Sequence, residues 1–531
     1  MNTSKQDQGN RRAEAGAAPG SRVAAGAPLA AGADRAGAAA EVGLVRALGL
    51  WDSTLLVIGL VLGSAVFMVT GGPDGVARLA PTPGLLLGAW IVGGIVSFAG
   101  ALVYAELGAA LPRAGGQYVF LREAYGDLTG FLYGWTLFTV IHTGTLAALA
   151  VGYAEYFGFF VPSLGTGHIL ITMPLFGHPL AISAGQVNAA FVIVFLSVVN
   201  YFGVKEGSVF QGIVTVVKIA SFAGFMILGI AVGKGSLAHF LPLFGAAPAA
   251  AGGTPIATGS AAAAPGAGIG GFILAMVAML WAYEGWNNIT FTAGEIKDPQ
   301  RNIPRSLVLG MSAITLIYVG MNLMYLYAMP IGEMTATPRI GEVAAGMLFG
   351  ASGPWLMSLA VLISVFGCIS ATVISGPRVF YAMAKDDLFF RQIAEVHPRF
   401  RTPARAILWQ CVWSSALCLS GTYNQLITFV IFAAVLFYAL AGASVIVLRR
   451  RHPEWPRPYR TWGYPFTPIL YVGVCLIVLA NTLVQQPAES GWGLLILVCG
   501  LPAYFYWKGQ RTRSAAARAA SGAAPPRPDR S

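Results

Sequence analysis

Long apolar stretches separated by short polar turns make up most of this chain. A helix needs about 20 apolar residues to cross a bilayer, and runs of that length predict twelve membrane spans. They lie near residues 49–70, 84–105, 127–155, 186–203, 209–232, 268–293, 304–328, 354–384, 404–420, 424–448, 465–485 and 491–508. The pattern therefore predicts an all-α, multi-pass membrane protein.

Two of the predicted spans are interrupted near their centres by small or polar residues. The first interruption reads Ile-Gly-Leu-Val-Leu-Gly-Ser-Ala-Val-Phe over residues 58–67, and the second reads Trp-Ala-Tyr-Glu-Gly-Trp-Asn-Asn over residues 281–288. A helix that breaks inside a membrane frees backbone amides and carbonyls, which must find partners inside the protein. Paired breaks of this kind indicate the binding site of a secondary transporter.

The positions of the breaks indicate an internal repeat. The first five spans cover residues 49–232 and the next five cover residues 268–448, so each group opens with an interrupted helix. Because five is odd, the second group enters the membrane from the opposite side, which makes the repeats inverted. Two further helices follow over residues 465–508. We expect a 5+5 inverted repeat with discontinuous helices 1 and 6.

Composition and charge agree with a membrane protein. Of 531 residues, 56% are hydrophobic and only 10% are charged, which is too few charges to cover a soluble core of this size. All but five of the 33 lysines and arginines fall on one side of the predicted spans; the exceptions are Arg78, Lys234 and Arg339 outside and Lys218 and Arg378 within spans. This asymmetry predicts cytoplasmic termini, and we expect the protein in the plasma membrane. No basic stripe with interleaved aromatic residues indicates a nucleic-acid partner.

The expected membrane domain covers residues 46–508. Residues 1–45 are rich in alanine and glycine and lack a run typical of a signal peptide, so they are predicted to be a disordered cytoplasmic tail. Residues 509–531 are predicted to be a second such tail. Residues 245–268 form an alanine-, glycine- and proline-rich insert in an outer loop. The cysteines, all within predicted spans and none in an outer loop, are Cys368, Cys411, Cys418, Cys475 and Cys499.

Several motifs occur in a fixed order along this domain. They are Gly63-Ser-Ala, Tyr104-Ala-Glu-Leu-Gly, Arg113-Ala-Gly-Gly-Gln-Tyr118, Lys218, Trp281-Ala-Tyr-Glu-Gly-Trp-Asn287 and Asp298-Pro-Gln-Arg-Asn-Ile-Pro304. On these motifs the chain resembles the amino acid–polyamine–organocation superfamily, and within it the L-type amino acid transporter family, over residues 49 to 450. The resemblance implies the twelve-helix fold with a 5+5 inverted repeat, and sodium-independent transport of amino acids by alternating access.

The resemblance places the substrate at the two breaks. Family members usually carry Gly-Ser-Gly where this chain has Gly63, Ser64 and Ala65, and the freed amides there bind the substrate carboxylate, as the positive end of a half-helix allows. Close packing of helices is the alternative role of such small residues. The carbonyls expected around the substrate amino group are those of Trp281, Ala282 and Glu284. The ring of Trp281 is also expected to close the outer side as a gate.

Two charged residues lie inside the predicted spans close to the breaks. Some relatives that carry dibasic amino acids have an acidic residue at the position of Glu284. Its carboxylate is interpreted as a counter-charge for a cationic substrate, as a protonation site coupled to transport, or as a partner of freed amides. A lysine at the centre of a span costs roughly 2.5–3.5 kcal/mol. The resemblance places Lys218 where sodium-coupled relatives hold a cation, so we expect a coupling role, with snorkelling to the interface as the alternative.

Five other polar positions, together with Ala434, carry weaker expectations. Glu106 and Arg378 are assigned to the inner gate, either as a pair or, alternatively, each facing the headgroups independently. His142 is interpreted as a packing residue rather than a proton relay. Asn287 and Asn288 either line the cavity or cap the resumed half-helix, and capping is favoured. Ala434 stands where the family carries a polar residue in span 10.

What the chain lacks narrows the function further. It contains no His-Glu-x-x-His, paired Cys-x-x-Cys, Gly-x-Ser-x-Gly or Walker-type motif, so we expect no enzyme, no cofactor and no metal site. Mammalian members of the light-chain branch bond a glycoprotein through a cysteine after span 3. Residues 156–185 contain no cysteine, which excludes a disulfide-linked subunit at that loop.

The expected function is secondary active transport of an amino acid, with a cationic amino acid as one candidate substrate. Exchange and proton-linked uptake both fit the residues, and the resemblance slightly favours exchange. A membrane receptor that binds amino acids with the transporter fold is the alternative function. A channel-like pore is disfavoured because the chain offers no ring of repeated polar residues.

Overall fold

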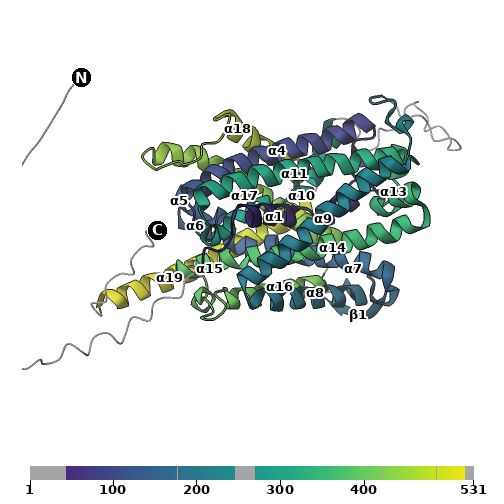
Figure 1. The fold of residues 1–531 in the computed structure, drawn as a ribbon. Helices are drawn as coiled ribbons and strands as arrows, with labels where there is room; N and C mark the ends of the chain where they lie inside the picture. Colours follow the sequence, from purple (N-terminus) through teal and green to yellow (C-terminus); the bar gives the residue numbers. More distant parts are fainter. Residues whose placement is uncertain are drawn as a thin grey trace, which may run out of the picture. The chain divides into compact units, whose positions relative to one another are not determined.

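Helices make up nearly all of the described structure, as the apolar pattern predicts (Figure 1). The structure is a computed structural model that describes residues 44–73, 75–175, 178–245, 269–420, 423–485 and 487–520. Residues 1–43 of the N-terminal tail predicted over residues 1–45, residues 246–268 of the insert predicted over residues 245–268, and the last residues, 521–531, lie outside the described residues.

The helices of the two predicted repeats follow one another along the chain. The first repeat contains α1 (Leu50–Val61), α2 (Ala65–Met68), α3 (Val76–Leu79), α4 (Pro83–Ala110), α5 (Gln117–Tyr125), α6 (Asp127–Thr136), the π-helix η1 (Leu137–Ile141), α7 (His142–Phe160), η2 (Pro162–Leu164), α8 (Ala184–Tyr201), α9 (Val204–Val232) and η3 (Leu237–Phe240). The second contains α10 (Ile269–Ala282), the 3-10 helix η4 (Trp286–Glu295), α11 (Pro299–Ala328), α12 (Ile331–Met334), α13 (Ile340–Phe349), η5 (Gly350–Ser352), α14 (Gly353–Ser375), α15 (Pro377–Lys385), η6 (Arg391–Ala394), α16 (Ala404–Ser420) and α17 (Tyr423–Arg451). Last come α18 (Phe466–Gln485) and α19 (Pro487–Ala520).

Ten helical segments in the described part of the chain are long and apolar enough to cross a membrane. All twelve predicted spans overlap helical residues, but two of them are not among these ten. One is the interrupted sixth span, in which α10 has only 14 residues, and the other is the ninth, in which α16 has 17. The chain is therefore a mostly helical, multi-pass membrane protein.

The structure interrupts both spans where the sequence predicts. The first interruption separates the end of α1 at Val61 from the start of α2 at Ala65, and the second separates the end of α10 at Ala282 from the start of η4 at Trp286. Each break therefore exposes the carbonyl end of one helical segment and the amide end of the next.

The two interrupted spans run in opposite directions beside each other. Ala47 and Leu48 lie just before α1, and Glu295 is the last residue of η4. The amides of Ala47 and Leu48 both lie 2.9 Å from the carbonyl oxygen of Glu295, so the start of α1 is beside the end of η4. At the middle, Gly285 packs against the backbone of Leu60. This antiparallel arrangement agrees with the inverted order of the predicted repeats.

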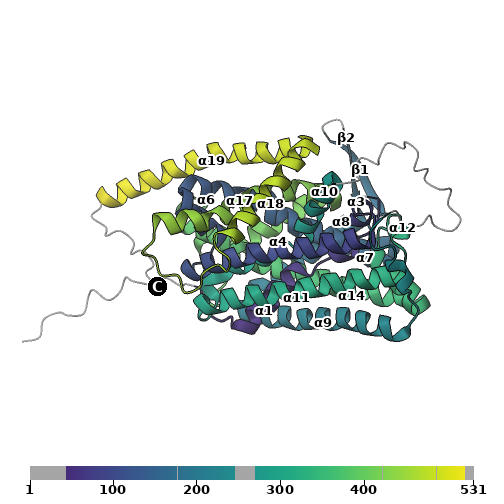
Figure 2. The ribbon, with the colours of Figure 1, turned by 90° about the horizontal axis from the view of Figure 1, so that it is seen from above.

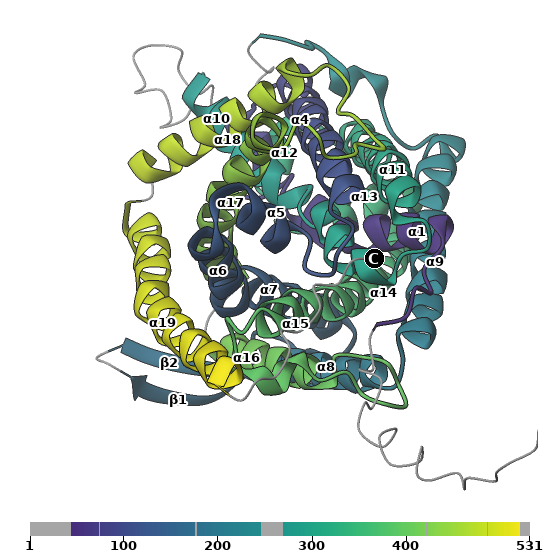
Figure 3. The ribbon, with the colours of Figure 1, turned by 90° about the vertical axis from the view of Figure 1, so that its left-hand side faces the viewer.

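Other helices enclose this central pair. Helix α1 packs against α9, α11 and α14, while α4 packs against α10 and α11. Figure 2 shows α9 running alongside α1. In the view along the helices, α19 lies at the rim beside α6 and α17 (Figure 3). The residues at the two breaks, such as Val61, Leu62 and Ala282, are buried, as free backbone groups require.

Two features of the fold differ from the expectation. The loop after α7 contains an antiparallel hairpin of β1 (Ile169–Leu175) and β2 (His178–Ser183), which the all-α prediction omits. Strand β1 contains Ile169, Ile171 and Thr172, and β2 contains Ile182, which are residue types that favour extended backbone. Helix α19 also continues to Ala520, so the boundary expected at residue 508 is too early, and residues 509–520 are helical instead of belonging to a disordered tail.

Candidate functional site

The carbonyl end of α1 is held by a buried ammonium group. Lys218 on α9 is completely buried, and its Nζ donates to the carbonyl oxygens of Gly59, at 3.1 Å, and Leu62, at 2.9 Å. The last carbonyls of a helix lack internal partners and carry partial negative charge. The ammonium supplies both hydrogen bonds and positive charge at this point. Snorkelling to the interface, the alternative for Lys218, is wrong.

Two side chains of α14 complete the coordination of the same helix end. The Cys368 thiol donates to the carbonyl oxygen of Leu60 at 3.0 Å, and the Ser364 hydroxyl donates to that of Leu62 at 2.9 Å. Both side chains are buried. Helix α14 and helix α9 therefore bind the first break together, and its carbonyls need no water to satisfy them.

One hydroxyl joins the two breaks. Tyr318 of α11 is fully buried, and its hydroxyl lies 2.8 Å from the carbonyl oxygen of Val61 and 2.9 Å from that of Ala282. Gly285 brings the second break close to the first, because its φ of +110° suits glycine and an added Cβ would lie 2.9 Å from the oxygen of Leu60. Neither break can move far without disturbing the other.

Glu284 lies within the second break and is half-buried. Its Oε1 accepts a hydrogen bond of 3.1 Å from the hydroxyl of Tyr438 on α17. The donor is thus a side chain, whereas the interpretation of Glu284 as a partner of freed backbone amides expects main-chain donors. Tyr438 stands one helical turn beyond the buried Ala434 and supplies a polar group that Ala434 lacks.

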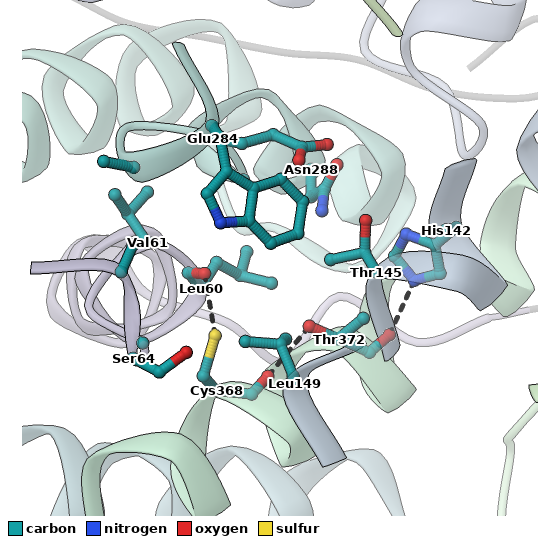
Figure 4. A pocket seen from close by; sticks show the side chains of 15 residues that line it. Leu60, Val61, Ser64, His142, Thr145, Leu149, Glu284, Asn288, Cys368 and Thr372 are labelled. Atoms are coloured by element: carbon teal, nitrogen blue, oxygen red, sulfur yellow. Dashed lines mark hydrogen bonds between the residues drawn. The ribbon is translucent and has the colours of Figure 1, made fainter. Parts of the chain in front are cut away.

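A cavity lies between the two breaks (Figure 4). Its lining includes the six residues that the sequence assigns to substrate binding, namely Gly63, Ser64, Ala65, Trp281, Ala282 and Glu284. It is completed by Leu60, Val61, His142, Thr145, Leu149, Gly285, Asn288, Cys368 and Thr372. The structure therefore brings together two segments more than 200 residues apart in the chain, and the amide end of α2 faces the same space as the carbonyl end of α10.

The polar residues beyond the breaks have other partners than expected. Gly285, with no side chain to offer, occupies the N-cap of η4, so capping by Asn287 or Asn288 is wrong. Asn288 lines the cavity, and Asn287 donates to the Gln117 side chain at 3.1 Å. The Gln117 amide donates in turn to the carbonyl oxygen of Phe437 at 3.1 Å.

The Arg-Ala-Gly-Gly-Gln-Tyr motif packs tightly under the second break. Gly116 has a φ of +42°, and a Cβ there would lie 2.3 Å from Thr290 Oγ1. The amide of Gly115 donates to the carbonyl oxygen of Phe291 at 3.0 Å. The two glycines thus allow the start of α5 to seat directly on η4, which explains their place in the motif.

Glu106 and Arg378 do not pair with each other, and neither faces headgroups. Arg378 is bound to Glu295 by two hydrogen bonds of 2.9 Å, and both residues are buried. The buried Glu106 accepts bonds of 2.7 and 2.6 Å from Arg449 on α17, and the amide of Thr461 donates to it at 2.8 Å. Each is a two-pronged arginine–carboxylate pair, a geometry that fixes orientation as well as distance.

The whole length of the helical domain matches a known family. A family model described as amino acid permease covers residues 48–505. The chain belongs to the amino acid permease family. Over 474 residues the permease is 32% identical to the serine/threonine exchanger SteT of Bacillus subtilis (strain 168), a match that covers 87% of this chain and 97% of that protein.

Mammalian transporters are also similar to this permease. The large neutral amino acids transporter small subunit 2 of Mus musculus is 30% identical over 87% of this chain and 82% of its own length. The b(0,+)-type amino acid transporter 1 of Mus musculus is 26% identical over 87% of this chain and of its own length. The permease is thus an amino acid transporter and not an enzyme, as the sequence predicts.

Sequence analysis misses several residues that shape the site of the permease. Tyr318 and Ser364 bind the breaks, Tyr438 binds Glu284, and Glu295 and Arg449 are the partners of Arg378 and Glu106. Tyr318 and Ser364 are polar residues within apolar runs, which is a signal that could single them out. His142, assigned to packing, is buried and lines the cavity, with its Nε2 2.9 Å from the carbonyl oxygen of Thr372.

We predict that Glu295→Gln strongly destabilises the permease. The change leaves the buried guanidinium of Arg378 without its counter-charge, and breaking a buried pair costs about 3–5 kcal/mol. The apparent melting temperature of the purified protein in detergent measures this loss. The control is Glu395→Gln, which removes the exposed pair that Glu395 forms with Arg405 at 2.8 Å and should cost less than about 1 kcal/mol. Equal losses in both variants would contradict a structural role of the buried pair.

Proposed function

We propose that the permease is a sodium-independent secondary transporter that works by alternating access. The observation that carries this proposal is the contact of Lys218 Nζ with the carbonyl oxygens of Gly59 and Leu62. A tethered ammonium already neutralises the carbonyl end of α1. A metal cation is therefore not needed to hold the first break, so transport does not depend on sodium.

The substrate is an amino acid held by its two charged ends. Its carboxylate accepts hydrogen bonds at the amide end of α2, near Ser64 and Ala65, which a helix leaves without internal acceptors. Its ammonium donates to the carbonyls at Trp281, Ala282 and Glu284. The support is that all of these residues line one cavity. The carbonyl oxygen of Ala282 accepts a hydrogen bond from the Tyr318 hydroxyl and keeps a second lone pair for the substrate ammonium.

Exchange of one amino acid for another is the proposed mode. The similarity to SteT, a serine/threonine exchanger, supports this mode. Proton-linked uptake is the alternative mode, and Glu284 is then the protonation site. The relatives' names include both neutral and b(0,+)-type transporters, so the panel of substrates to be tested includes neutral and cationic amino acids.

The proposed architecture has twelve membrane helices in a 5+5 inverted repeat, in the plasma membrane with both termini cytoplasmic. Trp281 closes the outer side of the cavity. Glu106 and Arg378 close the inner side through their pairs with Arg449 and Glu295. We further propose that no ancillary subunit is disulfide-linked through the loop after α7, because residues 156–185 contain no cysteine.

Counterflow in proteoliposomes tests the proposed function. Vesicles loaded with one unlabelled amino acid should accumulate the labelled form, without sodium and without a pH gradient. Dependence on an imposed pH gradient would replace exchange by proton-linked uptake. Binding without any accumulation across the amino acid panel would favour a receptor over a carrier.

We predict that Lys218→Ala abolishes counterflow while the protein still inserts. Without the ammonium, the carbonyl oxygen of Gly59 loses the Lys218 donor, that of Leu62 keeps the Ser364 hydroxyl but loses the positive charge, and the first break loses its geometry. The matched control is Ser221→Ala on the same helix, where the hydroxyl donates to the carbonyl oxygen of Val217 at 2.8 Å, within its own helix. Wild-type uptake by Lys218→Ala, with expression equal to that of the control, would refute the assigned role of Lys218.

We also predict that Glu284→Gln selectively loses arginine and lysine if its carboxylate is the counter-charge. The amide keeps the size and the acceptor for Tyr438 but removes the charge, so leucine should be affected much less. Glu284→Asp, which keeps the charge, is the control. Inhibition constants for arginine and leucine in the counterflow assay decide the matter, since an equal loss of both would point to a proton-linked or structural role.

A further inference from the structure

One face of the cavity is made by helices α7 and α14. Four polar side chains on this face line the cavity, namely His142, Thr145, Cys368 and Thr372. Figure 4 shows His142 and Thr372 joined by a hydrogen bond and Cys368 bound to the backbone of Leu60. The breaks supply groups for the two charged ends of an amino acid, so this face remains for the side chain of the substrate.

The hydroxyl and thiol hydrogens of this face point into the protein. The Thr145 hydroxyl donates to the carbonyl oxygen of Ile141 at 2.7 Å, and the Thr372 hydroxyl donates to the carbonyl oxygen of Cys368 at 2.8 Å. The Cys368 thiol donates to Leu60 at 3.0 Å. A hydroxyl whose hydrogen is used in this way still offers lone pairs on its oxygen. Thr145 and Thr372 therefore present acceptors to the cavity.

The tautomer of His142 follows from the same argument. Its Nε2 lies 2.9 Å from the carbonyl oxygen of Thr372, and a carbonyl oxygen can only accept. The hydrogen of the neutral ring must therefore be on Nε2, which leaves Nδ1 as an acceptor. The face formed by α7 and α14 thus has its donors engaged by backbone carbonyls and its lone pairs available.

Glu284 adds a further acceptor to the cavity. Its carboxylate receives one hydrogen bond, from Tyr438, and a carboxylate has room for several. Trp281 and Asn288, which also line the cavity, carry N–H donors, so the acceptor character belongs to the α7–α14 face and to Glu284. An apolar side chain placed there would remove water from these acceptors and give them no donor.

We propose that the α7–α14 face is the subsite for the substrate side chain and selects amino acids whose side chains donate hydrogen bonds. This inference rests on the proposed function, because it assigns the remaining part of the same cavity. Thr145 and His142 are its specificity-determining residues. The donor on the substrate is a hydroxyl, as in threonine, or an ammonium, as in ornithine. Comparing threonine with valine, and ornithine with norvaline, distinguishes the two.

The test compares binding of side chains that differ mainly in the donor. Purified permease in detergent is titrated with threonine, valine, ornithine and norvaline, and apparent Kd values are taken from the rise in melting temperature. We expect threonine to bind at least about tenfold more tightly than valine, or ornithine than norvaline, since buried acceptors without a donor discriminate strongly. The pair that shows the preference identifies the donor as hydroxyl or ammonium.

Variants then assign the preference to the face. Thr145→Val keeps the shape and removes the acceptor, so the binding ratio should fall by about threefold to tenfold. His142→Leu should reduce it further, whereas His142→Gln keeps an acceptor and a donor and should restore most of it. The matched control is Thr143→Val on the same helix, where the buried hydroxyl donates to Phe138 at 2.7 Å.

The outcomes separate this inference from the proposed function. Equal binding within both pairs, or ratios unchanged in Thr145→Val and His142→Leu, would overturn the inference even if counterflow succeeds. Selective binding that falls in Thr145→Val but not in Thr143→Val supports it, even if counterflow shows no transport and the carrier hypothesis fails. Absence of any shift with any of the four amino acids would overturn the inference, and counterflow across the amino acid panel would then decide the proposed function by itself.

Discussion

A buried ammonium at the end of a broken helix is the constraint on which the rest of this structure depends. Lys218 donates to the carbonyl oxygens of Gly59 and Leu62, at a depth where water cannot satisfy them. The cost of burying the charge is offset by the partial negative charge of the helix end. With its carbonyls satisfied by the protein, the first break can present its amides to a ligand.

The second break depends on the first. Tyr318 binds a carbonyl oxygen from each, and Gly285 lies directly against Leu60, so the two interrupted spans form one braced unit. Further along, η4 ends at Glu295, which holds Arg378 on α15. Any motion that separates η4 from α15 must therefore break or carry along a buried ion pair. The cavity and this ion pair are linked through one short 3-10 helix.

Much of this arrangement could be predicted from local sequence features. Breaks in apolar runs predicted the two discontinuous helices, because free backbone groups inside a membrane need partners in the protein. The position of Lys218 inside a span predicted a role for it, because burying a charge at that depth costs free energy. The positions of Gly63 and Trp281 in the cavity followed from the same breaks. The residues within each span were enough to locate these features, whereas the roles assigned to Gly63, Trp281 and Lys218 came from the resemblance to the family.

Partners that are distant in the sequence could not be predicted in this way. Glu106 binds Arg449, 343 positions away, and Arg378 binds Glu295, 83 positions away. Each arginine has several carboxylates at plausible depth, and only the packing of α15 and α17 chooses among them. The acceptor role of His142 depends on the Thr372 carbonyl, which no spacing rule reveals.

The central claim is that main-chain groups at the two breaks bind the charged ends of an amino acid. Calorimetric titration of the purified permease with a transported amino acid, its methyl ester and the corresponding carboxylic acid lacking the amino group tests it most directly. We predict saturable binding of the amino acid, and binding weakened by at least about a hundredfold for both analogues, since the ester loses the carboxylate charge and the acid loses the ammonium charge, each of which meets buried dipoles. Binding of the ester or the acid as tight as that of the amino acid would contradict the claim.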